Sequence, residues 1–102
     1  MRPRLKLHEK LCDILGSRNV YFQPPETLKM HYPCIVYSRG NGDTQYADNS
    51  TYTFEMRYDV ILIDPDPDSV LVSKIPEEFE KIVHDRHYTS NNLNHDVFRL
   101  YY

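Results

Sequence analysis

The sequence predicts an α+β fold: a mixed, mostly antiparallel sheet of four or five strands with a long β-hairpin, flanked by an N-terminal helix and a second helix. Three patterns indicate this fold. An apolar stripe with helical spacing opens the chain, alternating apolar and polar residues fill its middle, and a second alternating run leads to its end. With 102 residues, 40% of them hydrophobic, the chain is expected to fold as a single domain over residues 1–102.

The first predicted element is a helix over residues 3–15. Pro3 suits a first helical turn, and Gly16 is a natural stop. The apolar stripe between them consists of Leu7, Leu11, Ile14 and Leu15. After the helix, the run 20–23 predicts a short strand that the prolines at 24 and 25 end, because proline donates no ladder hydrogen bond.

The central part of the chain predicts a hairpin. Residues 34–38 form a short apolar strand, and residues 39–50 are polar, hold two of the three glycines and predict a mobile loop. A strand over 52–63 follows and is expected to extend beyond the compact body as one arm of that hairpin. Its apolar face is expected to carry Tyr52, Phe54, Met56, Tyr58, Val60 and Leu62.

The segment 64–69 ends this strand and predicts the start of a second helix. Asp66, Asp68 or Ser69 would be its N-cap, and Pro76 predicts that it breaks into two short pieces. The closing hairpin is expected to comprise a strand over 86–90, a turn over 91–94 and a strand over 96–102.

Charge is distributed unevenly along the chain, although the net charge is only −3. Residues 1–39 carry seven Lys and Arg against three Asp and Glu, and residues 40–102 carry five against twelve. This asymmetry allows head-to-tail pairing of copies, unless both charge sets are merely solvated. The small net charge favours neither a nucleic-acid binder nor a membrane-surface protein.

Cys12 and Cys34, the two cysteines, have the pattern of small core residues in a reducing compartment. The charged N-terminus does not resemble a signal peptide, and no apolar run is long enough for a membrane span, so we expect synthesis and assembly in the cytoplasm. Nine tyrosines without a tryptophan suit surfaces that a partner buries, or half-buried positions on strands.

Candidate chemistry is sparse. The nearest approach to a metal site is the cluster His84, Asp85, His87 and His95, but on a regular strand His84 and His87 would point to opposite faces unless a bulge intervenes. The aspartates 64, 66 and 68 lack the glycine and glutamate of a calcium loop. Neither a phosphate-binding loop nor a paired nucleophile and base is evident, so no cofactor is expected and an enzyme is not favoured.

Several stretches together resemble the tail completion, or tail terminator, proteins of long-tailed bacteriophages and prophages. The likeness covers about residues 30–102, and its specificity lies in the order and spacing of the stretches. They are Tyr32–Tyr37, Tyr46–Asn49, Tyr58–Asp64, Asp66–Ser69, Asp85–Tyr88 and Asn92–Phe98. The irregular segment 70–81 departs from the expected family pattern.

The resemblance implies a hexameric ring on the head-proximal end of the tail tube. There the chain would end tube polymerisation and join the tail to the head, with itself, the tube protein and the head–tail connector or head completion protein as partners. DNA would pass through the ring without sequence-specific contact. A neighbouring neck protein, either a connector or a head-closure component, is the alternative; a small metal-dependent regulator or enzyme is a more distant one.

The resemblance also implies which residues matter. It carries over no catalytic, cofactor or metal residues, and it places the chain in the virion. Residues of the predicted loop would contact partners on the ring surface or in its lumen: Arg39, Asn41, Asp43, Gln45, Tyr46, Asp48 and Asn49. Turn or cap residues would maintain the fold: Asp64, Asp66, Asp68, Ser69, Asn92, Asn94 and Asp96.

Overall fold

The computed structural model describes residues 3–45 and 55–102, with side chains over 4–40 and 56–102. Its elements are α1 (Pro3–Leu15), β1 (Val20–Phe22), β2 (Cys34–Gln45), β3 (Glu55–Asp64), α2 (Leu71–Glu77), β4 (Ile82–Ser90) and β5 (Leu93–Tyr101). The strands form one sheet in the order β1-β2-β3-β5-β4. Among the described strands, only the β1–β2 pair is parallel, so the predicted mixed, mostly antiparallel α+β fold is confirmed.

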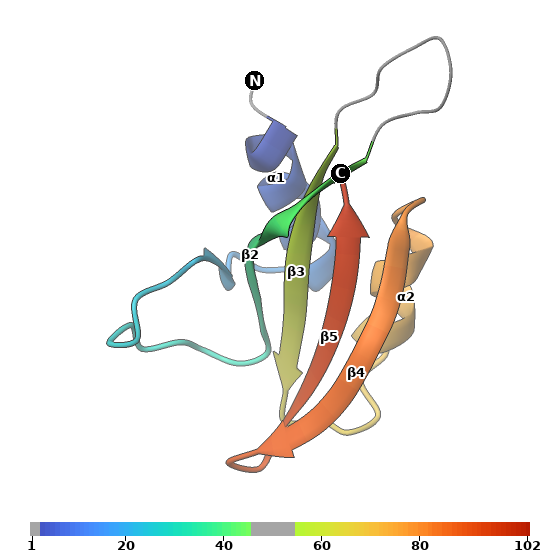
Figure 1. Ribbon diagram of the computed structural model, residues 1–102. Helices are drawn as coiled ribbons and strands as arrows, with labels where there is room; N and C mark the ends of the chain where they lie inside the picture. Colours follow the sequence, from blue (N-terminus) through green and yellow to red (C-terminus); the bar gives the residue numbers. More distant parts are fainter. Residues whose placement is uncertain (1–2, 46–54) are drawn as a thin grey trace, which may run out of the picture.

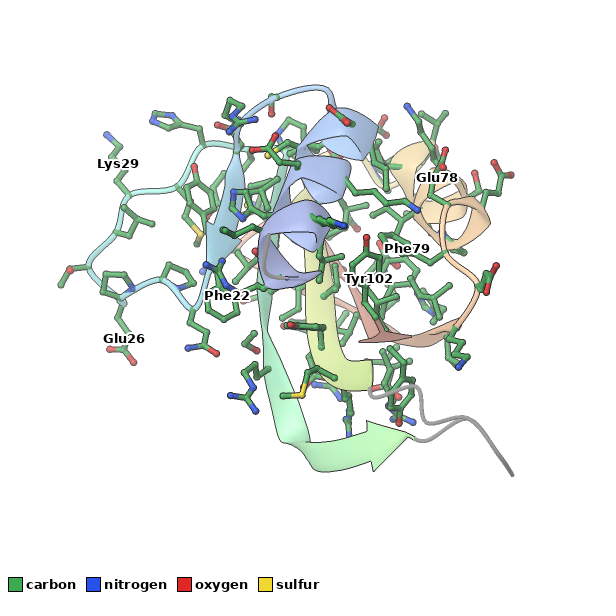
Figure 2. The ribbon with its side chains drawn as sticks, turned by 90° about the horizontal axis from the view of Figure 1, so that it is seen from above. Phe22, Glu26, Lys29, Glu78, Phe79 and Tyr102 are labelled. Atoms are coloured by element: carbon green, nitrogen blue, oxygen red, sulfur yellow. The ribbon has the colours of Figure 1, made fainter. Side chains whose placement is uncertain are left out.

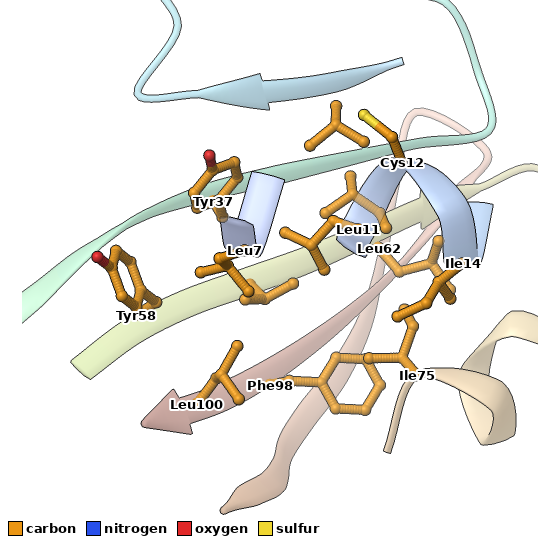
Figure 3. Packing of buried hydrophobic residues seen from close by; sticks show 13 residues of the cluster. Leu7, Leu11, Cys12, Ile14, Tyr37, Tyr58, Leu62, Ile75, Phe98 and Leu100 are labelled. Carbon is orange, nitrogen blue, oxygen red and sulfur yellow. The ribbon is translucent and has the colours of Figure 1, made fainter. Parts of the chain in front are cut away.

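Both helices cover the same face of the sheet (Figure 1). The core forms where side chains of the two helices meet alternate residues of β2, β3 and β5 (Figure 3). From the helices come Leu7, Leu11, Cys12, Ile14 and Ile75, and from the strands Val20, Ile35, Tyr37, Tyr58, Val60, Leu62, Phe98 and Leu100. The described part of the chain places no helix on the other face.

The structure confirms the predicted bounds of the N-terminal helix. Leu7 and Leu11 are fully buried, as the apolar stripe requires. Gly16 ends the helix with φ +81°, a left-handed conformation that glycine adopts without steric cost, and its N–H donates to the carbonyl of Cys12 at 2.8 Å. Cys12 and Cys34 are both free and buried, and burial raises the pKa of the Cys34 thiol to about 11.

The β2–β3 hairpin is confirmed, but the predicted loop from residue 39 is wrong as far as residue 45. The strand β2 continues to Gln45 because pairing with β3 resumes at Thr44 and Met56 after an irregularity that begins at Arg39. Pairing with a neighbouring strand thus outweighs a polar, glycine-containing composition. The predicted strand residues 52–54 lie outside the described residues.

The second helix is a single helix of seven residues with Pro76 near its end, so the predicted break into two pieces is wrong. Ile75 is its one buried residue, and Phe79 lies beyond its end, half-buried against the core. The helix begins after Val70, which makes no side-chain cap hydrogen bond, so the predicted caps Asp66 and Asp68 are wrong; Ser69 lies one residue earlier, and its Oγ accepts the backbone N–H of Leu71 at 3.3 Å. The carboxylates of Asp64 and Asp66 instead accept backbone N–H groups within the turn that precedes the helix.

The closing hairpin is confirmed with longer strands and a tighter turn than predicted. Asn91 and Asn92 have φ of +53° and +62°, as a two-residue hairpin turn of the primed type requires. Asparagine tolerates this left-handed conformation better than most residues. The pairing of Ser90 with Leu93 therefore begins directly at the turn.

Candidate functional site

Of the residues predicted to contact partners, four belong to β2 of the β2–β3 hairpin: Arg39, Asn41, Asp43 and Gln45. Arg39 is exposed and pairs with Tyr58, and its backbone N–H donates to the side-chain oxygen of Gln23 at 3.3 Å. Tyr46, Asp48 and Asn49 lie outside the described residues. A contact role for this arm stays a prediction.

The aspartate-proline segment after β3 is a series of side-chain turns. Asp64 Oδ1 accepts the backbone N–H of Asp66 at 2.8 Å, and Asp66 Oδ1 accepts that of Asp68 at 2.9 Å. Ser69 Oγ accepts the N–H of Leu71 at 3.3 Å. These bonds shape the chain between β3 and α2, which is the turn role predicted for these residues.

Hydrogen bonds from Asn94 connect this segment to the start of β5. The Asn94 side-chain amide donates to the carbonyl oxygens of Asp64 at 3.2 Å and Pro65 at 3.3 Å. Asn92 supplies one of the two left-handed turn residues. Asn92 and Asn94 therefore hold one end of the sheet together.

Asp96 is a buried carboxylate that two histidines approach. Its Oδ1 lies 3.1 Å from Nε2 of His84 and 3.0 Å from Nδ1 of His87, while the residue itself is 6% exposed. His84 also packs edge-on against the ring of Phe98, with centroids 5.1 Å apart. The two imidazoles are exposed on their outer sides and anchored on their inner sides to β5.

A β-bulge in β4 brings these histidines together. His84 pairs with Phe98 and Arg86 pairs with Val97, so Asp85 has no partner of its own on β5. The extra residue shifts the alternation by one position, and His87 then pairs with Asp96 on the same face as His84. The expectation that the two histidines point to opposite faces is therefore wrong, and the bulge is the reason.

The other members of the predicted histidine cluster lie elsewhere. His95 stacks on Tyr88 with ring centroids 4.6 Å apart, and Asp85 accepts hydrogen bonds from Arg99 at 3.2 Å and Arg86 at 3.3 Å. Among the described residues, no group of three or more His, Cys, Asp or Glu is arranged to hold a metal ion. The geometry of Asp96 and its histidines supports a role in joining β4 to β5.

The sheet face without helices carries charges that neutralise one another. Arg57 donates to Asp59 at 3.3 Å, and Asp85 lies between Arg86 and Arg99. Positive and negative groups thus alternate across β3, β5 and β4. Among the residues that the structure describes, this face therefore shows no concentration of charge of one sign.

The two lateral margins of the molecule, in contrast, differ in charge. We call α1, β1 and the segment up to residue 33 the basic margin; residues 3–33 carry five Lys and Arg against three Asp and Glu. We call the segment 64–70, α2 and β4 the acidic margin; residues 64–90 carry three against seven. Because β1 and β4 are the two edge strands, the parts of the margins that carry Lys29 and Glu78 lie on opposite sides (Figure 2), whereas α1 lies between them and Nζ of its Lys10 is 4.7 Å from the ring centroid of Phe79.

The large exposed apolar side chains of the described residues fall within the same two margins. On the basic margin they are Leu5, Leu28 and Tyr32, and on the acidic margin Val70, Val83 and Tyr88. Within β4, every residue from 83 to 90 is exposed. Sequence reasoning found the charge asymmetry but missed these side chains, because single apolar residues within polar segments give no pattern.

Neither helix in the described part of the chain has the length and apolar character needed to cross a lipid bilayer. Comparisons with protein-family models, with curated proteins and with solved structures found no match.

Proposed function

We propose that this chain is a structural protein of a long bacteriophage tail. As a ring of copies it caps the head-proximal end of the tail tube, ends tube polymerisation and provides the surface that joins the tail to the head. The proposal comes from the resemblance to tail terminator proteins, and one structural relationship among the resembling stretches supports it.

That relationship is contiguity. The stretches that resemble the family are scattered between residues 32 and 98, yet four of them lie side by side in the sheet: Tyr32–Tyr37, Tyr58–Asp64, Asp85–Tyr88 and Asn92–Phe98. Tyr46–Asn49 lies outside the described residues. One row crosses four strands through Cys34, Ile63, His95 and Tyr88, each residue paired with the next. The described part of the likeness therefore falls on one folded unit, with the turn 64–69 attached to it through Asn94.

The outer surface is also suited to ring assembly. A ring of identical subunits joined head to tail needs two different surfaces on each copy that complement one another. The basic and acidic margins are two such surfaces, and their edge strands, β1 and β4, lie on opposite sides of the sheet. An arrangement of this kind favours a closed ring or a filament over an isologous dimer.

Light scattering of the purified chain with and without tail tube protein tests this proposal. We expect particles of about six copies, the usual family state, at least when tube protein is present. Monomers under all conditions would contradict it. A pull-down then distinguishes the two ring proteins of the neck: binding to tube protein supports the tail terminator, and binding to the connector alone supports the head-closure alternative.

A further inference from the structure

We infer that the acidic margin of one copy docks on the basic margin of a second copy. The inference rests on the ring assembly of the proposed function and specifies which surfaces form the contact between subunits. The occupant of each margin is thus another copy of this chain.

Charge complementarity favours a contact between unlike margins. Apart from Asp64, which is buried, and Asp85, which is paired with Arg86 and Arg99, residues 64–90 carry five exposed acidic residues against two further basic ones, and residues 3–33 carry five basic against three acidic. Docking of two acidic margins would place like charges together, which costs free energy and slows encounter. Head-to-tail docking instead brings Glu78 and its neighbours of one copy toward the Lys29 margin of the next, because within one copy Lys29 and Glu78 lie on opposite sides (Figure 2).

The exposed apolar residues supply the second part of the argument. Leu28 and Tyr32 are 39% and 41% exposed on the basic margin, and Val83 is 59% exposed on the acidic margin. Stable interfaces combine an apolar centre with a polar, charged rim. Each margin presents both components, so the two can cover one another's apolar side chains.

The edge strand supplies the third part. In the described chain β4 pairs with β5 alone, so its other edge has no strand beside it. Free edges readily acquire partners, but a bulge makes an edge a poor template for a continuous ladder. Because the bulge at Asp85 interrupts β4, we infer a contact through side chains rather than an added strand.

Charge reversal on each margin tests the inference. One variant carries Glu78→Lys and Glu80→Lys, another carries Arg18→Glu and Lys29→Glu, and a third combines all four; these four side chains are exposed. Sedimentation, with tube protein wherever wild type requires it, measures assembly. Each double variant is expected to assemble at least about tenfold more weakly, because like charges then face each other. The combined variant is expected to assemble again, because the margins are complementary with exchanged signs.

Cross-linking gives an independent measurement if a charge variant fails to fold, which thermal unfolding detects. Copies with Leu28→Cys are mixed with copies with Val83→Cys and oxidised; wild type is the control, since Cys12 and Cys34 are buried. Cross-links in the mixture, and none in either variant alone, support the inference. An assembled ring without such cross-links, or one indifferent to charge reversal, overturns it and leaves the proposed function standing. Failure of wild type to assemble, with or without tube protein, overturns both.

Discussion

The hydroxyl of Tyr37 lies 2.7 Å from Nδ1 of His8, and this pair connects α1 to the buried centre of β2. Arg4 Nη1 donates to the same hydroxyl oxygen at 3.4 Å. The Tyr37 hydroxyl can then donate its own hydrogen to Nδ1, which must carry a lone pair. Burial, assisted by the positive charge of Arg4, lowers the pKa of His8 below its ordinary value of 6.5.

This relationship predicts that acid weakens the fold through His8. As pH falls, the unfolded chain takes up a proton at His8 before the folded chain does, because the folded-state pKa is the lower one. The contribution to stability is complete above 6.5 and is lost as pH falls through that value toward the folded-state pKa. Urea unfolding between about pH 8 and about pH 5 measures this loss.

The variant His8→Asn supplies the comparison. Asparagine keeps an acceptor for the Tyr37 hydroxyl but does not titrate, so we expect a shallower decline of stability with falling pH. A decline as steep as that of wild type would show that His8 does not cause it.

The geometry around Asp96 predicts that the neutral rings of His84 and His87 are different tautomers. When both rings are neutral, donation to the carboxylate requires the hydrogen on Nε2 of His84 and on Nδ1 of His87. Nitrogen NMR of the imidazoles at about pH 8 or above distinguishes the two forms. The same tautomer on both rings would contradict the shared carboxylate. In Asp96→Asn, whose side chain has one acceptor oxygen and a donor amide, at least one tautomer preference should be lost.

The close approach of Gly40 to the side chain of Arg57 predicts that substitutions at these two positions have coupled effects on stability. A methyl group on Gly40 would lie 2.7 Å from Cγ and 2.8 Å from Cδ of Arg57, closer than atoms in contact normally approach. We expect Gly40→Ala to cost about 1–3 kcal/mol of unfolding free energy. The cost should largely disappear in an Arg57→Ala background, since truncation frees the space. Equal costs in both backgrounds, measured by urea unfolding, would argue against the clash.

The burial of Ile75 predicts a large contribution of this side chain to the packing of α2 against the core. Ile75 is the buried residue of that short helix and is fully enclosed. We expect Ile75→Ala to cost about 2–5 kcal/mol, because it removes buried methyl groups and leaves a cavity. Val70→Ala is the matched control, since Val70 is 76% exposed, and it should change stability by no more than about 0.5 kcal/mol. Similar effects of both changes would show that α2 packs differently.

The sequence was sufficient for the elements with regular patterns. The stripe through Leu7 and Leu11 predicted α1 with its bounds, and the alternation through Tyr58, Val60 and Leu62 predicted the buried face of β3. Local chemistry decides both elements, because each residue's place follows from its neighbours in the chain.

The features that the sequence did not predict depend on pairing between distant segments. The continuation of β2 past Arg39 requires β3 beside it, and the bulge at Asp85 exists only relative to β5. No local pattern distinguishes a bulged strand from a regular one, so the convergence of His84 and His87 on Asp96 was not foreseeable. The capping error has a similar cause, because Asp66 and Asp68 take part in their own turns.

Electron microscopy of tails assembled without this chain tests the central claim most directly. If the chain caps the tube and joins it to the head, its absence should give tails of irregular, excessive length that carry no heads, and restoring the chain should correct both defects. Tails of regular length attached to filled heads, made in its absence, would contradict the account.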